Sequence, residues 1–203
     1  MRAVPSVVLE RRRMIGLNQI VNLYRRVSCV RRFGTTPCLF PENVSSHMYL
    51  VGLISLVLIG NRTDIDKFRV LGMSLTHDIE ESLQGDVVAT VKRFLPAVRE
   101  ALDEAAKEFL GVVIEDIQNK DLLSSLWYEY KDQGTEEAKL AKQADRIAQI
   151  VPMVIEHDLG NVYSEQILKN IAVVLAENEY EEIDEIYNYL AERGITPGNT
   201  VEW

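Results

Sequence analysis

A histidine and several acidic residues lie close together in the segment Thr76-His77-Asp78-Ile79-Glu80-Glu81-Ser82-Leu83-Gln84-Gly85-Asp86. An imidazole next to a carboxylate offers a neutral nitrogen and an anionic oxygen, which make a ready pair of metal ligands. Apolar residues recur at helical spacing from Asp64 to Glu81, so we expect one amphipathic helix there. In that helix, residues 77 and 81 are four apart and lie on one side. A metal-bound water would then lie within reach of Glu81, which is a hydrolase arrangement in outline.

Two other segments carry side chains that could complete such a site. The run Pro41-Glu42-Asn43-Val44-Ser45-Ser46-His47 places a histidine at the first turn of an apolar segment, Met48 to Ile59. The run Ala138-Lys139-Leu140-Ala141-Lys142-Gln143-Ala144-Asp145-Arg146 places an aspartate inside a long helix. The simpler alternative for His77-Asp78 is a helix C-terminus, with the imidazole near the negative end of the dipole. The three segments together favour a metal site over that alternative.

These segments resemble the HD-domain metal phosphohydrolases, whose ligands come in the order His, His-Asp, Asp. The blocks "ENVSxH", "HDxxExLxGD", "TVK" and "KLxKQAD" are similar to those of the bacterial HD-domain 5′-deoxynucleotidases, which hydrolyse deoxynucleoside monophosphates. The resemblance runs from about Ile20 to the last long helix, although Ser46 stands where relatives carry Glu. It implies an all-α HD-domain helical bundle, and the helical period of nearly every segment separately indicates an all-α chain. It also implies four metal ligands: His47, His77, Asp78 and Asp145.

The resemblance assigns roles to residues around these ligands. Glu81 and Asp86 fall at positions taken to be catalytic: Glu81 would orient or deprotonate the attacking water, and Asp86 would donate a proton or hold metal-bound water. Arg32 falls where the family contacts phosphate, which a guanidinium can hold through two parallel hydrogen bonds. Phe33 stands where the family typically has Trp to crowd out a ribose 2′-hydroxyl, so the smaller ring puts strict deoxyribose preference in question. Lys92 could offer a second cation or be a solvated helix lysine.

Two imidazoles and two carboxylates suit one divalent transition ion better than magnesium. Manganese, cobalt, zinc and iron all fit this ligand set. Such an ion would neutralise phosphate oxygens and lower the pKa of bound water from about 16 toward 7. The leading prediction is therefore a 5′-nucleotidase that acts on deoxynucleoside monophosphates. The alternatives are a deoxynucleoside triphosphohydrolase and a catalytically silent HD module that binds a nucleotide or a partner.

Composition sets the remaining expectations. With 203 residues and 47 % hydrophobic content, we expect one domain over residues 14–203, preceded by a loose tail at residues 1–13. The net charge of −9 argues against nucleic-acid binding but not against a small anionic substrate beside a metal. The apolar run from Met48 to Ile59 is too short to span a bilayer. Only two cysteines, Cys29 and Cys38, indicate a reducing compartment, so we expect a cytoplasmic protein without membrane partners.

Further helices are expected around the central ones. Leu17 to Arg32 has a stripe that we expect to be buried, and the apolar Met48 to Ile59 helix should be central in the domain. Asp121 to Tyr130 offers two core anchors, and Pro152 should kink or end the helix that Thr135 caps. The resemblance implies a homodimer or higher homo-oligomer. The last helices offer residues for either its interface or the core: Tyr180, Ile183, Tyr187 and Leu190.

Overall fold

The computed structural model describes residues 17–87, 95–176 and 183–195. Ten helices lie within these ranges and no strand does, which confirms the all-α prediction for this part of the chain. The predicted tail at residues 1–13 lies outside it. The helices are α1 (Leu17–Val27), α2 (Val44–Ile59), α3 (Lys67–Thr76), α4 (Glu81–Gln84), α6 (Pro96–Ile114), α7 (Lys120–Asp132), α8 (Glu136–Ala148), α9 (Ile150–Asp158), α10 (Ser164–Ala176) and α11 (Ile183–Ala191).

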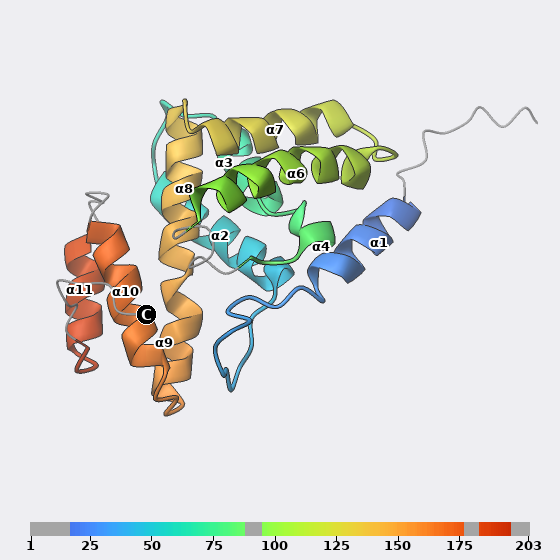
Figure 1. Cartoon of the computed structure of the whole chain (residues 1–203). Helices are drawn as coiled ribbons and strands as arrows, with labels where there is room; N and C mark the ends of the chain where they lie inside the picture. The colour runs from blue at the N-terminus through green and yellow to red at the C-terminus, as the bar shows by residue number, and fades with distance from the viewer. Residues whose placement is uncertain (1–16, 88–94, 177–182, 196–203) are drawn as a thin grey trace, which may run out of the picture.

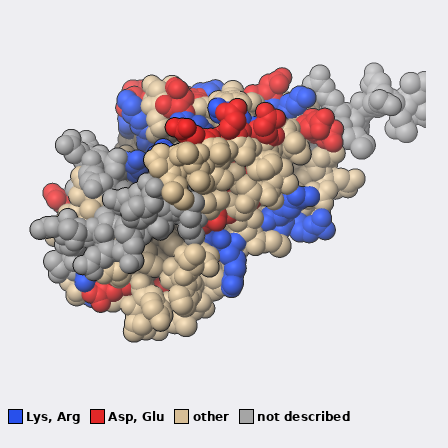
Figure 2. Space-filling model, in the orientation of Figure 1, with Lys and Arg blue, Asp and Glu red and all other residues tan. Residues whose placement is uncertain are grey.

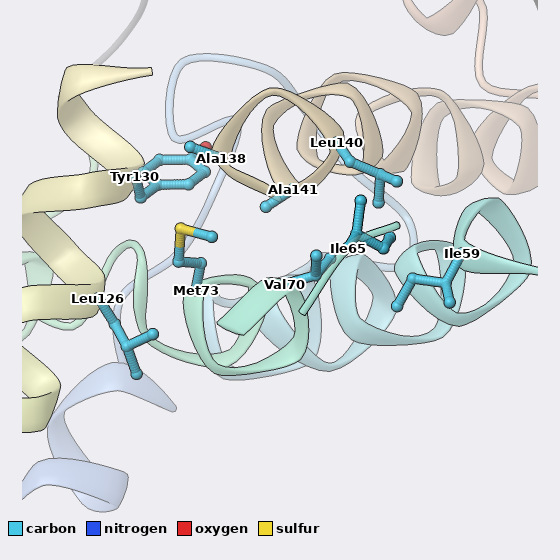
Figure 3. Close-up of a cluster of buried hydrophobic side chains, with 9 residues drawn as sticks. All are labelled: Ile59, Ile65, Val70, Met73, Leu126, Tyr130, Ala138, Leu140 and Ala141. Carbon is cyan, nitrogen blue, oxygen red and sulfur yellow. The ribbon is translucent and has the colours of Figure 1, made fainter. Parts of the chain in front are cut away.

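The helices α8 and α9 form a nearly continuous column, with α10 and α11 on one side and α6 and α7 crossing on the other (Figure 1). The central core lies where α2, α3, α7 and α8 meet. Burying one such aliphatic side chain contributes about 1.5–3 kcal/mol, so this cluster fixes the helices against one another. Figure 3 shows its buried members: Ile59, Ile65, Val70, Met73, Leu126, Tyr130, Ala138, Leu140 and Ala141.

The first turn of α2 is fixed by a reciprocal cap. The Asn43 side chain accepts a hydrogen bond from the backbone N–H of Ser46, and the Ser46 hydroxyl accepts one from the backbone N–H of Asn43. This capping box satisfies two amides that the helix leaves unpaired. It places the next residue, His47, on the buried side of α2. Ser46 therefore has a local structural role in this chain.

The predicted single helix from Asp64 to Glu81 is wrong. Asp66 is itself the N-cap, because its carboxylate accepts hydrogen bonds from two backbone amides at the start of α3. The helix ends at Thr76, and residues 77–80 continue as tight turns with i to i−3 hydrogen bonds before α4 begins. His77 and Glu81 are consequently not stacked one turn apart on one continuous helix.

Several helices expose apolar residues that the sequence pattern places in the core. On α1, which ends at Val27 and not at Arg32, only Val27 is buried, while the rest of the stripe is exposed: Leu17, Ile20, Val21 and Tyr24. The helix α2 is buried on one side only and exposes the other: Tyr49, Leu53, Leu56 and Val57. Hydrophobic periodicity identifies an apolar face without saying what covers it.

Other predictions agree with the structure. Trp127 and Tyr130 are buried on α7, and the Thr135 hydroxyl caps α8 by accepting from the backbone N–H of Ala138. The column breaks at Gln149, so Pro152 falls in the first turn of α9, where its missing N–H costs little. Within the described ranges, no helix combines the length and apolarity needed to cross a membrane.

Charged side chains are unevenly distributed on the face shown in Figure 2. Acidic side chains gather along its upper edge, above an uncharged area, and basic side chains form small separate groups. The basic side chains of the described residues therefore form no continuous surface on this face. The absence of nucleic-acid binding stays a prediction from the net charge.

Candidate metal and phosphate site

Three buried side chains converge between α2, the end of α3, and α8. The Nε2 atom of His47 lies 2.9 Å from Asp145 Oδ1, and the Nε2 atom of His77 lies 3.8 Å from the same oxygen. One potential ligand atom from each of the three residues lies within 4.8 Å of the others. Asp78 Oδ2 lies 3.2 Å from His77 Nε2 and extends the cluster. The structure thus brings together all four residues predicted as metal ligands.

The hydrogen bond that His77 makes leaves the nitrogen lone pair that a metal requires, whereas His47 Nε2 is bonded to Asp145 Oδ1. His77 Nδ1 lies 2.9 Å from the backbone carbonyl oxygen of Ser74, which can only accept, so this nitrogen carries the proton. In the neutral ring, Nε2 then has a lone pair facing the Asp78 carboxylate. Among the described residues, neither His77 Nε2 nor His47 Nδ1 has a hydrogen-bond partner. A buried lone pair next to carboxylates lacks a positive charge, so these donors fit a divalent cation.

The pKa directions indicate the same missing charge. Burial would raise the pKa of Asp145, but Lys142 and the two imidazoles hold it well below its ordinary value. Burial would lower the pKa of His77, but Asp78 and Asp145 more than offset this and raise it. Burial lowers the pKa of His47 to about 4, so this ring is neutral at pH 7 and able to bind a metal. Asp78 and Asp145 thus favour a positive charge at His77, which a metal ion could also supply.

The second oxygen of Asp145 is held by groups on α7 and α8. The Tyr130 hydroxyl donates to Asp145 Oδ2 over 2.6 Å, and Lys142 Nζ donates to the same oxygen over 2.8 Å. Because Oδ2 has two donors, Oδ1 is left facing the histidines. Such partners orient metal ligands and raise their affinity. The sequence predicted Tyr130 only as a core anchor, since nothing in helical spacing reveals where a hydroxyl points.

Glu80 is a buried residue of the site that the sequence analysis missed. Its carboxylate accepts hydrogen bonds from Trp127 Nε1 over 2.8 Å and from Lys131 Nζ over 2.9 Å. Burial raises the pKa of Glu80, and Lys131 partly offsets the effect. These bonds anchor the turn that carries His77 and Asp78 to α7. They also bring Lys131 close to the predicted metal ligands. The sequence pattern did not predict this position, because Lys131 lies on a half-exposed helix face.

Arg32 lies beside the cluster on the segment between α1 and α2. Its Nε atom donates to Glu42 Oε2 over 3.1 Å, and its Nη1 atom lies 3.6 Å from Asp78 Oδ2. Burial raises the pKa of Glu42 to about 7, although Arg32 partly offsets it. Asp86 is near enough to raise the pKa of both Arg32 and Glu42. Arg32 is therefore placed where a phosphate bound at the cluster would meet it.

The structure describes three of the four remaining predicted site residues. Glu81 is the first residue of α4 and is buried. Gly85 has φ +76°, a conformation that favours glycine, and turns the chain so that Asp86 lies outside the helix, as predicted. Phe33 packs against the cluster formed by α9, α10 and α11, with the Arg32 guanidinium 5.9 Å from its ring centre. Lys92 lies outside the described residues.

Comparison with known families places this site in a class. The family described as "HD domain" matches residues 29–187, which is most of the chain. The chain therefore belongs to the HD-domain family, and the matched range contains every predicted metal ligand.

Several relatives of known sequence are named 5′-deoxynucleotidases. The chain is 32 % identical over 121 residues to a 5′-deoxynucleotidase of Mus musculus, covering 60 % of this chain and 59 % of that protein. It is 31 % identical over 153 residues to a 5′-deoxynucleotidase of Bos taurus, covering 72 % of each chain. It is 30 % identical over 181 residues to a 5′-deoxynucleotidase of Vibrio vulnificus, covering 82 % of this chain and 89 % of that protein. The chain thus spans less than two thirds of the mouse relative but most of the bacterial one.

Solved structures agree on the fold. An HD-domain phosphohydrolase from Listeria innocua superposes with a TM-score of 0.67 at 21 % identity, covering 87 % of this chain and 86 % of that one. A cyanophage S-2L HD phosphohydrolase, bound to dA and one catalytic Zn²⁺ ion, superposes with a TM-score of 0.54 at 19 % identity, covering 85 % of this chain and 94 % of that one. At these identities the likeness establishes the HD fold.

Proposed function

We propose that this protein is a metal-dependent 5′-nucleotidase that hydrolyses deoxynucleoside monophosphates to nucleoside and phosphate. The observation that carries the proposal is the convergence of His47, His77 and Asp145, with Asp78 at its edge and Arg32 beside it. The relatives named 5′-deoxynucleotidase support the substrate class.

The four predicted ligands would hold one divalent transition ion, with manganese, cobalt, zinc and iron all compatible with two imidazoles and two carboxylates. Such an ion supplies positive charge to phosphate oxygens and makes water a better nucleophile at neutral pH. Phosphate monoesters are among the slowest substrates to hydrolyse without a catalyst, so this charge has a large barrier to lower.

The residues of the chain would divide the remaining work. Arg32 would bind the phosphate, because Glu42 accepts from its Nε atom while its Nη1 atom lies beside Asp78 at the cluster. Glu81 would take the proton of the attacking water, and Asp86 would return a proton to the leaving oxygen. Burial of Glu81 supports this role, since it limits competing solvent around the carboxylate.

Monophosphates are favoured over triphosphates by the ion pairs at the site. Each described cation here is paired with a carboxylate: Arg32 with Glu42, Lys131 with Glu80, and Lys142 with Asp145. A triphosphate carries additional negative charge that would have to compete for these cations. We therefore keep the deoxynucleoside triphosphohydrolase only as an outcome of the test.

The test is an assay of purified, metal-analysed protein against ribo- and deoxynucleoside mono-, di- and triphosphates. We expect inorganic phosphate from deoxynucleoside monophosphates. Triphosphate released from a deoxynucleoside triphosphate would identify the alternative enzyme, and no product with any nucleotide would indicate a silent binding module. The ratio of deoxy to ribo rates reports how far Phe33 excludes a 2′-hydroxyl. A cytoplasmic location stays a prediction from the sequence.

We also propose that the protein forms a two-fold dimer, but not through the last helices. Leu190 is fully buried, and the Tyr187 hydroxyl donates to the backbone carbonyl of Ala172, so these residues serve the core. Tyr180 lies outside the described residues. The α2–α3 face is a better candidate surface, and we define it by six exposed apolar residues: Tyr49, Leu53, Leu56, Val57, Phe68 and Leu75.

The exposure of the α2–α3 face and the neutrality of α2 support pairing with a second copy. Its six apolar residues are 43–78 % exposed, which is typical of a surface that a partner could cover, and each partner of a standard interface buries ~800 Å². The helix α2 carries no acidic or basic residue, so the α2 part of this face can meet a second copy about a two-fold axis without like charges facing each other. Light scattering should give a mass near twice 23.1 kDa. Val57→Glu should shift it to the monomer mass, whereas Val112→Glu on α6 should not; a monomeric wild type would overturn the proposal.

A further inference from the structure

Glu156, on α9, is a buried acid for which the proposed reaction has no use. Glu156 is 0 % exposed. Its carboxylate contacts a segment that lies more than a hundred positions earlier in the chain. Oε2 accepts from the backbone N–H of Leu39 over 2.8 Å, and Oε1 accepts from the backbone N–H of Phe40 over 2.5 Å. Both donors belong to the connection between α1 and α2, which reaches toward α9 in Figure 1.

Asn161 completes this contact from the turn after α9. Its Nδ2 atom donates to Glu156 Oε2 over 2.6 Å and to the backbone carbonyl of Pro37 over 2.7 Å. Burial would raise the pKa of Glu156, but the hydrogen bonds from Asn161, Leu39 and Phe40 lower it below its ordinary value. The carboxylate is therefore ionised at neutral pH, and its bonds to these donors are charge-assisted.

The same connection carries the residues assigned to nucleotide binding. Its two ends are tied together by an isolated backbone bridge between Arg31 and Asn43, with Arg32 next to the bridge. Phe33 has φ +53°, a backbone conformation that a bulky residue keeps only when its surroundings impose it. Glu156 and Asn161 provide such surroundings on the far side of the connection, and the packing of Phe33 against α9 and α10 provides the rest.

We propose that Glu156 is a positioning residue, whose buried carboxylate clamps the Leu39–Phe40 backbone and thereby holds Arg32 and Phe33 in place for nucleotide binding. The inference rests on the proposed nucleotidase function, because it concerns how tightly that substrate is held. The predicted metal ligands lie on α2, in the turn after α3 and on α8, outside the segment that Glu156 contacts. The clamp therefore governs substrate affinity and not metal content.

The decisive variant is Glu156→Gln, which keeps the size of the side chain. A carboxylate can accept on both oxygens, whereas an amide presents an NH₂ group to at least one of the three donors, so at least one bond is lost. The matched control is Glu165→Gln on α10, which removes the same charge from an exposed ion pair with Lys169. Asn161→Ser is a milder second variant, because its hydroxyl can still accept the hydrogen bond that Asn161 Oδ1 takes from the backbone N–H of Tyr163.

Two measurements test the inference separately from the proposed function. Hydrogen exchange of the Leu39 and Phe40 amides should quicken about tenfold in Glu156→Gln, consistent with loss of a hydrogen bond to a charged group, and stay unchanged in Glu165→Gln. With a deoxynucleoside monophosphate, KM should rise about tenfold while kcat changes less than about threefold and metal content is unchanged. Asn161→Ser should shift both readouts in the same direction by less.

The outcomes are distinguishable. If Glu156→Gln only lowers the folded fraction, with KM unchanged in what remains folded, the residue is structural and the inference is overturned. Unchanged exchange at Leu39 and Phe40 would also overturn it. If the wild-type protein neither binds nor hydrolyses any nucleotide, the proposed function fails and the inference falls with it, while the exchange data still show whether the clamp exists.

Discussion

The two sides of the site are built differently. On the metal side, His47 and Asp145 project from long helices, and His77 from the end of a third, into a core where tyrosine, lysine and backbone groups hold them. On the substrate side, Arg32 and Phe33 lie on a connection without regular structure that depends on distant contacts from α9. The predicted metal ligands thus lie on packed helices or directly beside them, whereas the predicted substrate residues lie on a connection that contacts from α9 hold in place.

The strongest test of the metal side is Asp145→Ala. The variant removes one ligand and leaves Lys142 without its partner carboxylate, so it should lose most of its metal and at least about 10³-fold in turnover. Metal content by atomic emission and turnover should be measured on the same sample. Asp103→Ala, at an exposed position on α6, is the control. Full metal content with wild-type turnover would refute the assignment.

The next largest effect separates chemistry from metal binding. Glu81→Ala should keep its metal and most of its substrate affinity while kcat falls about 10²-fold or more, as expected when a general base is lost. Measuring kcat and metal content on the same preparation tests whether Glu81 acts in the chemical step and not in metal binding. Near-normal kcat in fully metallated protein would transfer the role to Asp86.

On the substrate side, Arg32→Ala should raise KM for every nucleotide, whatever its base, by about 10–100-fold, because a charge-assisted phosphate contact is lost. Arg62→Ala, which removes an exposed ion pair with Asp64, is the control. Steady-state kinetics on two different bases provide the measurement. An effect on one base alone would contradict a phosphate contact.

The smallest effect concerns two opposed titrations in metal-free protein. The pKa of Glu42 is raised from 4.5 to about 7, so its contribution to stability is present below pH 4.5 and is lost as pH rises toward 7. The pKa of His47 is lowered from 6.5 to about 4, so its contribution is present above pH 6.5 and is lost as pH falls toward 4. Between pH 5 and 6.5 the two trends oppose each other.

Glu42→Gln should remove the opposing titration of Glu42 and leave that of His47. In chelator, the free energy of unfolding of the variant should rise by about 1–2 kcal/mol from pH 5 to pH 6.5, while that of the wild type changes less. Urea unfolding at the two pH values measures both. A flat response in Glu42→Gln would mean that His47 does not keep its lowered pKa in the metal-free protein.

The sequence by itself determined the helical class, and its resemblance to the HD-domain phosphohydrolases predicted the four ligand residues that the structure brings together. Helical period is a local property, and short blocks such as "HDxxExLxGD" carry the family resemblance without fixing where the helix ends. It also predicted Trp127 and Tyr130 as buried, because large aromatics in a helical stripe are seldom left in solvent.

Only the tertiary structure decided where α3 ends, which apolar faces are left exposed, and which polar groups reach the site. Asp66 stops the expected helix from starting at Asp64, and the turns after Thr76 are stabilised by bonds from Glu80 to α7. The contacts of Glu80, Lys131 and Glu156 join residues 47 to 117 positions apart. A hydrogen bond between distant residues leaves no periodic trace in a sequence, because it depends on packing that brings the two segments together.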